Sequence, residues 1–135
     1  MAQQLGRPVV KAWNAIGSDS FARKGKPAGS ADRIAIPVAA DSETEGQLGT
    51  ALVEDTGFDA FDAGPLAESW RQQPGTPCYC TDLTRAEMPA ALAAADATRS
   101  PKRRDLAAAA VHERFGPTSN PDADYAFRIN RALYM

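Results

Sequence analysis

Few side chains in this sequence could perform catalysis by themselves. His112 is the only histidine, and it is expected inside a helix, one turn before Gly116, where a cation is favoured by the helix dipole. Because the chain has no other imidazole, its residue types do not support a nucleophilic triad. We interpret His112 as a structural residue.

The cysteines are the next candidates. Cys78 and Cys80 are separated by one residue, a spacing that rarely gives a disulfide. A zinc site would need further ligands, and with one histidine these would have to be carboxylates. We expect two reduced, partly buried thiols.

Two aspartates flank a predicted strand. Asp59 and Asp62 are three residues apart, so they point to opposite faces and cannot act as a paired acid and base. Asp62 comes directly before the turn at Gly64 and Pro65, at the carboxyl end of the strand, where open α/β sheets bind ligands. The alternative is a turn-forming aspartate that accepts hydrogen bonds from nearby amides.

Three cations occupy the first turn of a predicted helix, at Lys102, Arg103 and Arg104. Positive charge is unfavourable at that end of a helix, so something has to compensate it. Asp96 and Asp105 could pair with these cations, and an anionic partner is the functional alternative.

No phosphate-binding glycine turn is present. Gly46 and Gly49 lie inside a predicted helix, too late and at the wrong spacing to cradle a pyrophosphate, and the sequence contains no P-loop. Glycine in a helix interior costs about 1 kcal/mol relative to alanine. Close packing against a neighbouring backbone is the better explanation for both.

The clearest unit of the chain is a strand, a helix and a second strand between residues 33 and 66. Alternating residues from Ile34 to Val38 predict a half-buried strand. Ser42, with Glu45 three residues later, predicts a capped helix start, and Gly57 predicts its end. The helix carries Leu48, Ala51 and Leu52 on one face. The second strand spans 58–63, and a crossover helix implies that the two strands run parallel.

The segments before this unit are less regular. Residues 3–6 resemble the last turn of a helix, which suggests that a preceding part has been lost, and 9–13 predicts a buried strand whose partner in the sheet is not evident. Residues 17–32 predict a loop with a helical turn near 20–24. Its basic residues suit a solvated surface better than a phosphate site; they are Arg23, Lys24 and Lys26.

After Leu66 the sequence predicts helices. A short helix at 67–73 is ended by Pro74 to Pro77. A second segment is capped by Asp82 or Thr84 and continues to 98, with Pro89 marking either a kink or a restart. A third helix has Ser100 as cap and Gly116–Pro117 as stop. The last helix is signalled by Asn120 and Pro121, has Asp122 and Asp124 in its first turn, and carries Tyr125, Ile129 and Leu133 on one face.

Composition limits the class of protein. The 135 residues form one α/β domain, with a strand-helix-strand core at 1–72 holding about three strands and a helical part at 73–135. Because 27 residues are alanine, the core is thin and favours a partner surface. A net charge of -2 argues against nucleic-acid binding. No apolar run is long enough to span a membrane. The first residues lack the apolar core of a signal peptide. We expect a cytoplasmic protein.

The order of motifs resembles a known family. The motifs are VVKAWNAI at 9–16, IPVAAD at 36–41, GFDAFDAGPLAESWR at 57–71, RQQPGTP at 71–77 and INRAL at 129–133. They resemble the carboxyl-terminal part of the deazaflavin-dependent NADP oxidoreductases, which carry a V-K-A-F-N strand, a P-V-A/C-G-D strand and a D-A-G-P-L turn in this order. Ala40 departs from the glycine that many relatives have before the aspartate.

The resemblance implies a site and its cofactors. Members of the family begin with a Rossmann domain that holds NADP, and we expect that this chain begins after it. The matching positions would shape the pocket of the second cofactor, deazaflavin or flavin, and would not bind the dinucleotide phosphates. These positions are Trp13, Asn14, Asp62, Gly64, Pro65 and Leu66. By the resemblance, Asn14 would orient a ring by hydrogen bonding.

Two hypotheses follow for the function. The first is the cofactor-pocket half of a hydride-transferring oxidoreductase, which needs a separate Rossmann-domain chain. The second is a self-associating, non-catalytic or repurposed domain that binds a small molecule and forms a homodimer to cover its thin core and its unpaired first strand.

Overall fold

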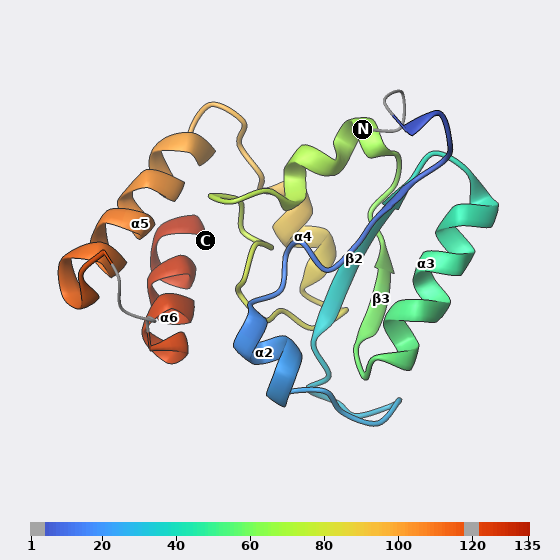
Figure 1. Ribbon diagram of the computed structural model, residues 1–135, viewed down its shortest axis with the longest axis horizontal. Helices are drawn as coiled ribbons and strands as arrows, with labels where there is room; N and C mark the ends of the chain where they lie inside the picture. The colour runs from blue at the N-terminus through green and yellow to red at the C-terminus, as the bar shows by residue number, and fades with distance from the viewer. Residues whose placement is uncertain (1–4, 118–121) are drawn as a thin grey trace.

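The computed structural model describes residues 5–117 and 122–135. A sheet of three strands lies at its centre in the order β1 (Val10–Lys11), β2 (Ala35–Ala40) and β3 (Asp59–Asp62) (Figure 1). β2 and β3 run parallel, and β1 is antiparallel to β2. The predicted class is confirmed: an α/β fold with a small, partly parallel sheet, a crossover helix and a mostly helical C-terminal part.

Strand β1 has a partner that the sequence did not reveal. Val10–Lys11 lies opposite Ala39–Ala40 on the edge of β2 that the strand-helix-strand unit leaves open. The prediction of an unpaired first strand was therefore wrong. The strand is also shorter than the predicted 9–13, because Trp13 has a φ of 57° and turns the chain away from the sheet.

Strand β2 is buried on both faces, whereas the alternating pattern predicted a half-buried strand. Ile36 and Val38 pack in the cluster that contains Val53 and Phe58, on the side of the crossover helix. The alanine on the other face packs in a second cluster, which consists of Ala35, Cys78, Leu83, Met88 and Ala91. The alternation of large and small residues therefore does not separate a buried face from an exposed one. Both faces of β2 are covered, and the large residues lie on one face and the alanine on the other.

Helix α3 (Glu43–Asp55) connects β2 to β3 and begins and ends as predicted. The Glu45 N–H donates to the Ser42 hydroxyl at 3.5 Å, and Gly57 follows the helix with a φ of 93°. The face formed by Leu48, Ala51 and Leu52 points to solvent, while Gly49 and Val53 face the sheet. The leucine stripe is therefore not part of the core.

The two glycines of α3 have different surroundings. A Cβ at Gly49 would lie 2.6 Å from Val10 Cγ1 and 3.0 Å from Val38 Cγ1, so this glycine lets the helix approach the sheet. At Gly46 the nearest atom would be Ala40 Cβ at 3.9 Å, an ordinary contact. Close packing was thus predicted correctly only for Gly49, and the neighbours are side chains, not backbone.

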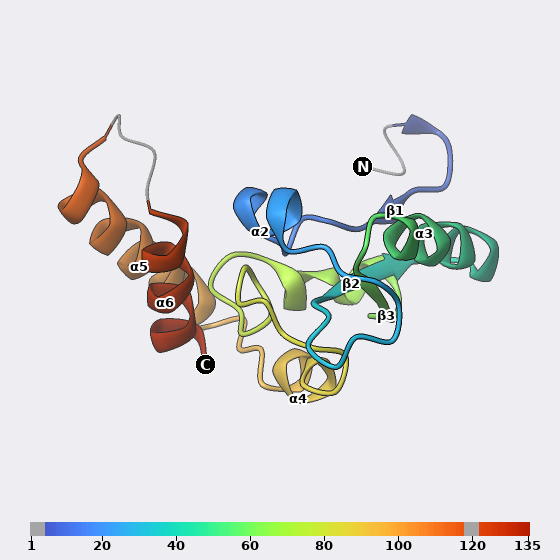
Figure 2. The same cartoon turned by 90° about the horizontal axis from the view of Figure 1, so that it is seen from below.

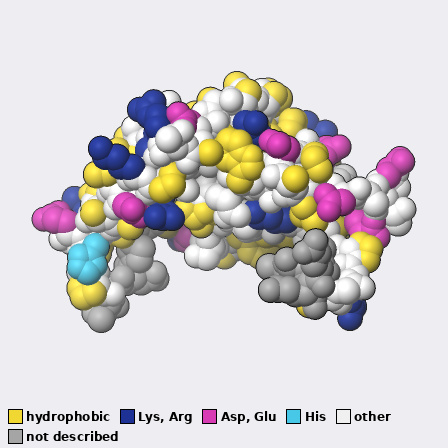
Figure 3. Space-filling view, turned by 90° about the horizontal axis from the view of Figure 1, so that it is seen from above, with side chains coloured by type: hydrophobic (Ala, Val, Ile, Leu, Met, Phe, Trp, Pro, Cys, Tyr) yellow, Lys and Arg dark blue, Asp and Glu magenta, His cyan; other side chains and the backbone are white. Residues whose placement is uncertain are grey.

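The segment between β1 and β2 contains the predicted helical turn as α2 (Ser18–Arg23). Its cations are paired: Arg23 contacts Asp19 at 2.5 Å, Lys24 contacts the buried side chain of Asp82 at 2.9 Å, and Lys26 pairs with Asp32. On the face in Figure 3, acidic, basic and apolar side chains of the described residues are interspersed. The predicted solvated basic surface is therefore a set of neutralised ion pairs.

After β3 the chain forms the expected short helix, which is a 3-10 helix, η1 (Leu66–Gln72), and begins one residue before the predicted 67–73. Residues 73–87 contain no helix: Pro74 to Pro77 end η1 as predicted, whereas the helix expected from Asp82 or Thr84 begins only at Met88. Backbone geometry explains this, because Gly75, Cys80 and Asp82 all have positive φ.

Helix α4 (Met88–Ala93) is shorter than predicted, and its N-cap is Glu87. Neither Asp82 nor Thr84 caps it. The Thr84 N–H and hydroxyl donate to the Glu87 carboxylate at 2.8 and 2.9 Å, and Asp82 accepts from Ser20 Oγ at 2.7 Å. Both predicted caps therefore bind other partners.

Helices α5 (Ser100–Phe115) and α6 (Ala123–Tyr134) form an antiparallel hairpin beside the α/β part (Figure 2). The hairpin is attached by Arg131, whose Nε donates to Thr81 O at 2.9 Å. Asp122, predicted within the first turn, is instead the N-cap of α6 and accepts from two backbone N–H groups. The predicted start at Asn120 and Pro121 lies outside the described residues. Within the described ranges, no helix is long and apolar enough to cross a membrane.

The start of α5 differs by one residue from the prediction. Ser100 is the first helical residue, and the N-cap is Arg99. Of the two acids expected to balance the cations, Asp105 pairs with Arg104 at 2.8 Å. Asp96 instead accepts from the N–H groups of Thr98 and Arg99, so its carboxylate stabilises the turn before the helix.

Candidate functional site

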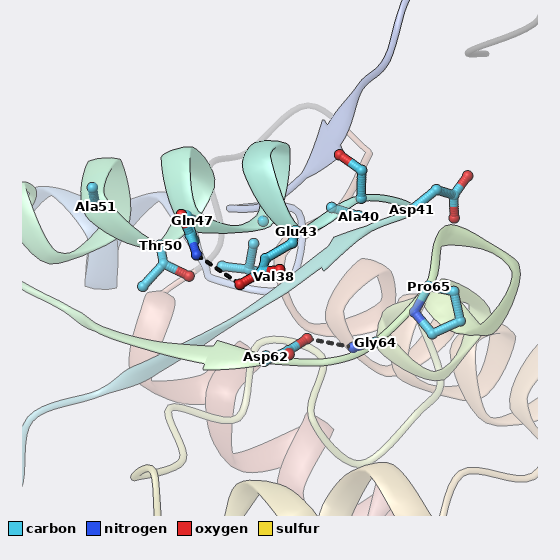
Figure 4. A pocket seen from close by; sticks show the side chains of 12 residues that line it. Val38, Ala40, Asp41, Glu43, Gln47, Thr50, Ala51, Asp62, Gly64 and Pro65 are labelled. Carbon is cyan, nitrogen blue, oxygen red and sulfur yellow. Dashed lines mark hydrogen bonds between the residues drawn. The ribbon is translucent and has the colours of Figure 1, made fainter.

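A cavity of about 700 Å³ lies where the parallel strands β2 and β3 end, under the first half of α3 (Figure 4). Strands contribute one wall, the turn after β3 a second, and α3 the third. The lining residues are Val38, Ala40, Asp41, Ser42, Glu43, Gly46, Gln47, Thr50, Ala51, Asp62, Gly64 and Pro65. The volume suits a small organic molecule, and this edge of an open α/β sheet is where such folds bind ligands.

Asp62 shapes the turn that borders this cavity. The Gly64 N–H donates to Asp62 Oδ1 at 2.8 Å, and Gly64 has a φ of 81°, which glycine adopts easily. Gly64 O in turn accepts from the Ala40 N–H at 3.1 Å, so the turn is fixed to β2. The turn-forming role of Asp62 is confirmed, and its side chain also lines the cavity. Asp59 points to the other face, as predicted, and pairs with Arg33.

All charged residues in the lining are acidic. Asp41 accepts from the Leu66 N–H at 2.9 Å, and Glu43 accepts from Gln47 Nε2 at 3.0 Å, so both carboxylates are held by uncharged donors. No lysine, arginine or histidine belongs to the described lining. The cavity therefore has a negative potential, which disfavours phosphate and favours a neutral or cationic group.

Leu66 lies outside this cavity. It lines a smaller one of about 440 Å³ on the other side of Asp41 and Ser42, which belong to both linings. Arg7 is the cation of the smaller cavity. Its lining also contains Asp41 and Glu45, so the two cavities adjoin and acidic side chains outnumber basic ones in both.

Trp13 and Asn14 line neither cavity. Asn14 Nδ2 donates to Gln72 O at 2.7 Å, and Asn14 Oδ1 accepts from Gln72 Nε2 at 2.9 Å, so both ends of its amide are engaged with a fully buried residue. Trp13 Nε1 lies 3.4 Å from Thr56 Oγ1, at the far end of α3. The structure therefore places the six predicted site residues in four surroundings and brings together Asp62, Gly64 and Pro65.

Sequence reasoning missed the contribution of α3. Glu43, Gln47 and Thr50 lie one helical turn apart on one face, and Gly46 and Ala51 fill the space between them. This spacing was visible in the sequence. The lining overlaps the predicted apolar face of α3 only at Ala51, because Leu48 and Leu52 do not line the cavity.

The thiols are placed where they cannot act as nucleophiles at neutral pH. Burial raises the pKa of Cys78 to about 11 and that of Cys80 to about 12, so both stay protonated. Cys78 donates to Arg71 O at 3.1 Å, and both cysteines are free. Within the described ranges, no three histidine, cysteine or acidic side chains gather in a way that could hold a metal ion.

Taken together, the fold and the cavity define an α/β domain with a ligand-sized, negatively charged cavity at the carboxyl ends of its parallel strands. Comparison with known proteins adds one relative. A stretch of 62 residues is 52% identical to the protein YjhV of Escherichia coli (strain K12), covering 46% of this chain and 45% of YjhV. The chain therefore matches less than half the length of that protein. No family model and no solved structure matches.

Proposed function

We propose that this chain forms the ring-binding pocket of a hydride-transferring oxidoreductase that uses NADP and a deazaflavin or flavin, and that a separate Rossmann-domain chain holds the dinucleotide. The observation that carries the proposal is the position of the D-A-G-P turn. Asp62, Gly64 and Pro65 line a cavity of about 700 Å³ at the carboxyl ends of the parallel strands.

The charge of the cavity supports a ring as its occupant. With Asp41, Glu43 and Asp62 in the lining, a phosphate would be repelled, whereas the edge of an uncharged ring can donate hydrogen bonds to the carboxylates. The adjoining cavity holds Arg7 together with Asp41 and Glu45, so its lining does not add a site for an anionic group. A bound nicotinamide and deazaflavin or flavin would supply the hydride chemistry, and this chain would orient the ring and shield it from water.

The absence of a glycine-rich turn from the sequence supports the need for a partner. Gly46 and Gly49 lie inside α3, and Gly49 is used for packing against Val10. The pyrophosphate of the dinucleotide would therefore be held by another chain.

Cavity-filling variants test the proposal directly. Thr50 lines the cavity, so Thr50→Trp should abolish the binding of a deazaflavin or flavin in a fluorescence titration. Leu52→Trp adds the same bulk to the same helix on its exposed face and should leave binding unchanged. When a Rossmann-domain chain is added, NADPH oxidation, followed as loss of its absorbance, should be abolished by Thr50→Trp and left unchanged by Leu52→Trp. Equal binding by both variants, or none by the parent chain, would contradict the proposal.

A second candidate is a homodimeric small-molecule-binding domain without hydride transfer. It is favoured by the apolar stripe of α3, where Leu48 and Leu52 are 59% and 47% exposed. Burial of a leucine contributes about 1.5–3 kcal/mol. Each Leu→Glu substitution here should therefore weaken a dimer by about tenfold or more in light scattering. Leu106→Glu on α5, where the leucine is 48% exposed, is the matched control.

A further inference from the structure

Strand β3 is the last strand of the described sheet, and its outer side would normally attract another strand. The N–H groups of Asp59 and Ala63 donate to Ile34 O and Val38 O of the β2 segment, at 2.9 and 2.8 Å. Because backbone groups alternate along a strand, the N–H and C=O of Ala60 point away from β2. Ala60 is therefore the residue at which a further strand would pair.

Two side chains already occupy the backbone of Ala60. Its N–H donates to Glu54 Oε1 at 2.8 Å, and its carbonyl accepts from Arg85 Nη2 at 2.7 Å. The same Arg85 nitrogen contacts Glu54 Oε1 at 3.0 Å, which closes a ring of hydrogen bonds. The carboxylate and the guanidinium thus take the places of the C=O and N–H that a neighbouring strand would offer.

A buried cation fixes this arrangement. Arg33 is only 3% exposed, and its Nη1 contacts Glu54 Oε2 at 2.6 Å and Asp59 Oδ1 at 2.9 Å. Its Nη2 donates to the backbone carbonyl of Glu54 at 3.0 Å. Glu54 is therefore held from the interior through one oxygen while its other oxygen faces Ala60.

We infer that Glu54 and Arg85 form an edge clamp, defined by these two side chains on Ala60, that closes β3 to pairing with a second copy of the chain. Asp62 is then the only other outward-facing residue of the strand, and one residue cannot form a ladder. The inference is independent of the proposed oxidoreductase function.

The double variant Glu54→Ala, Arg85→Ala tests the clamp. It should form larger assemblies than the parent chain in light scattering at the same concentrations, and the Ala60 amide should exchange with solvent about tenfold or more faster. Asp59→Asn is the matched control, because it weakens the same Arg33 network and leaves both bonds to Ala60 in place. It should keep the parent assembly state.

Arg85→Ala alone keeps the experiment decisive if the double variant does not fold. The Arg85 side chain is 56% exposed, and its removal frees the Ala60 carbonyl without touching the pair of Arg33 and Glu54. It should raise self-association above that of Asp59→Asn. A folded clamp variant that stays in the parent assembly state, or one that assembles no more than the control, would overturn the inference.

Discussion

At the scale of single residues, Gly49 sets how closely the crossover helix approaches the sheet. The 2.6 Å and 3.0 Å distances from a Cβ to two valine methyl groups are too short for any side chain to fit without movement. Val38 belongs to the buried core on that side. Gly49 therefore lowers the helix propensity of α3, and it allows α3 to pack closely against the sheet.

We expect Gly49→Ala to lower the free energy of unfolding by about 1–3 kcal/mol, since overpacking outweighs the gain in helix propensity. Gly46→Ala in the same helix, where the nearest atom would lie 3.9 Å away, should instead raise it by about 0.5–1 kcal/mol. Urea denaturation of the two variants measures the difference. Equal stability would show that the helix can shift away from Val10 without cost.

The Asn14 side chain, which the family resemblance assigns to binding a cofactor ring, is hydrogen-bonded to Gln72 at both ends of its amide. Asn14→Ala would leave the amide nitrogen and the backbone carbonyl of Gln72 without these partners, in a residue with no exposed surface. We expect a loss of about 1–3 kcal/mol in denaturation experiments. Trp13→Phe, which removes a weaker 3.4 Å contact, should cost well under that amount. A fully stable Asn14→Ala protein would speak against this structural role.

At the scale of elements, the helical hairpin depends on a few polar contacts with an irregular loop. Arg131 donates to Thr81 O at 2.9 Å, and Asn130 donates to Cys80 O at 3.4 Å. Helices α5 and α6 pack mainly on each other. The hairpin is thus an element that can loosen while the sheet stays intact.

Arg131→Ala should therefore increase amide exchange and proteolysis in α6 with little change in β2 and β3. Arg128 is a suitable control, because its one bond to a described residue is to Asp124 O of its own helix, at 3.2 Å. We expect Arg128→Ala to behave like the parent protein. If hydrogen exchange were faster throughout the chain, the hairpin and the sheet would unfold as one unit.

At the scale of the whole molecule, buried thiols link stability to pH. A thiol with a raised pKa binds its proton more tightly in the folded state than in the unfolded state, so its contribution is complete below the ordinary value of 9.0 and is lost as pH rises above it. The loss should run from pH 9.0 toward about 11 for Cys78 and about 12 for Cys80.

The free energy of unfolding should accordingly fall as pH rises from 9.0 toward about 11. The upper limit of the loss is about 1.4 kcal/mol for each unit by which a thiol's pKa differs between the folded and unfolded states. Cys78→Ala should show a shallower decline over the same range, measured by urea denaturation at fixed ionic strength. A parallel decline in both proteins would assign the effect to other groups, such as Tyr134, whose pKa burial raises to about 12.

Local signals in the sequence determined the central unit. Ser42, Glu45 and Gly57 act on the backbone groups beside them, so the limits of α3 could be predicted, and a crossover helix of that length leaves only a parallel pairing. The turn at Asp62 and Gly64 is local for the same reason. These residues fixed the fold class and the part of the candidate site that borders β3.

Only the tertiary structure decided which distant segments meet. The pairing of β1 with β2, the second cover of β2 around Leu83, and the bond from Asn14 to Gln72 all join residues far apart in the chain. The irregular path of residues 73–87 begins with the local helix stop at Pro74 to Pro77, whereas the late start of α4 at Met88 was not evident from local signals. Packing and hydrogen bonding between distant segments outweigh local preferences because each side chain responds to every neighbour in space.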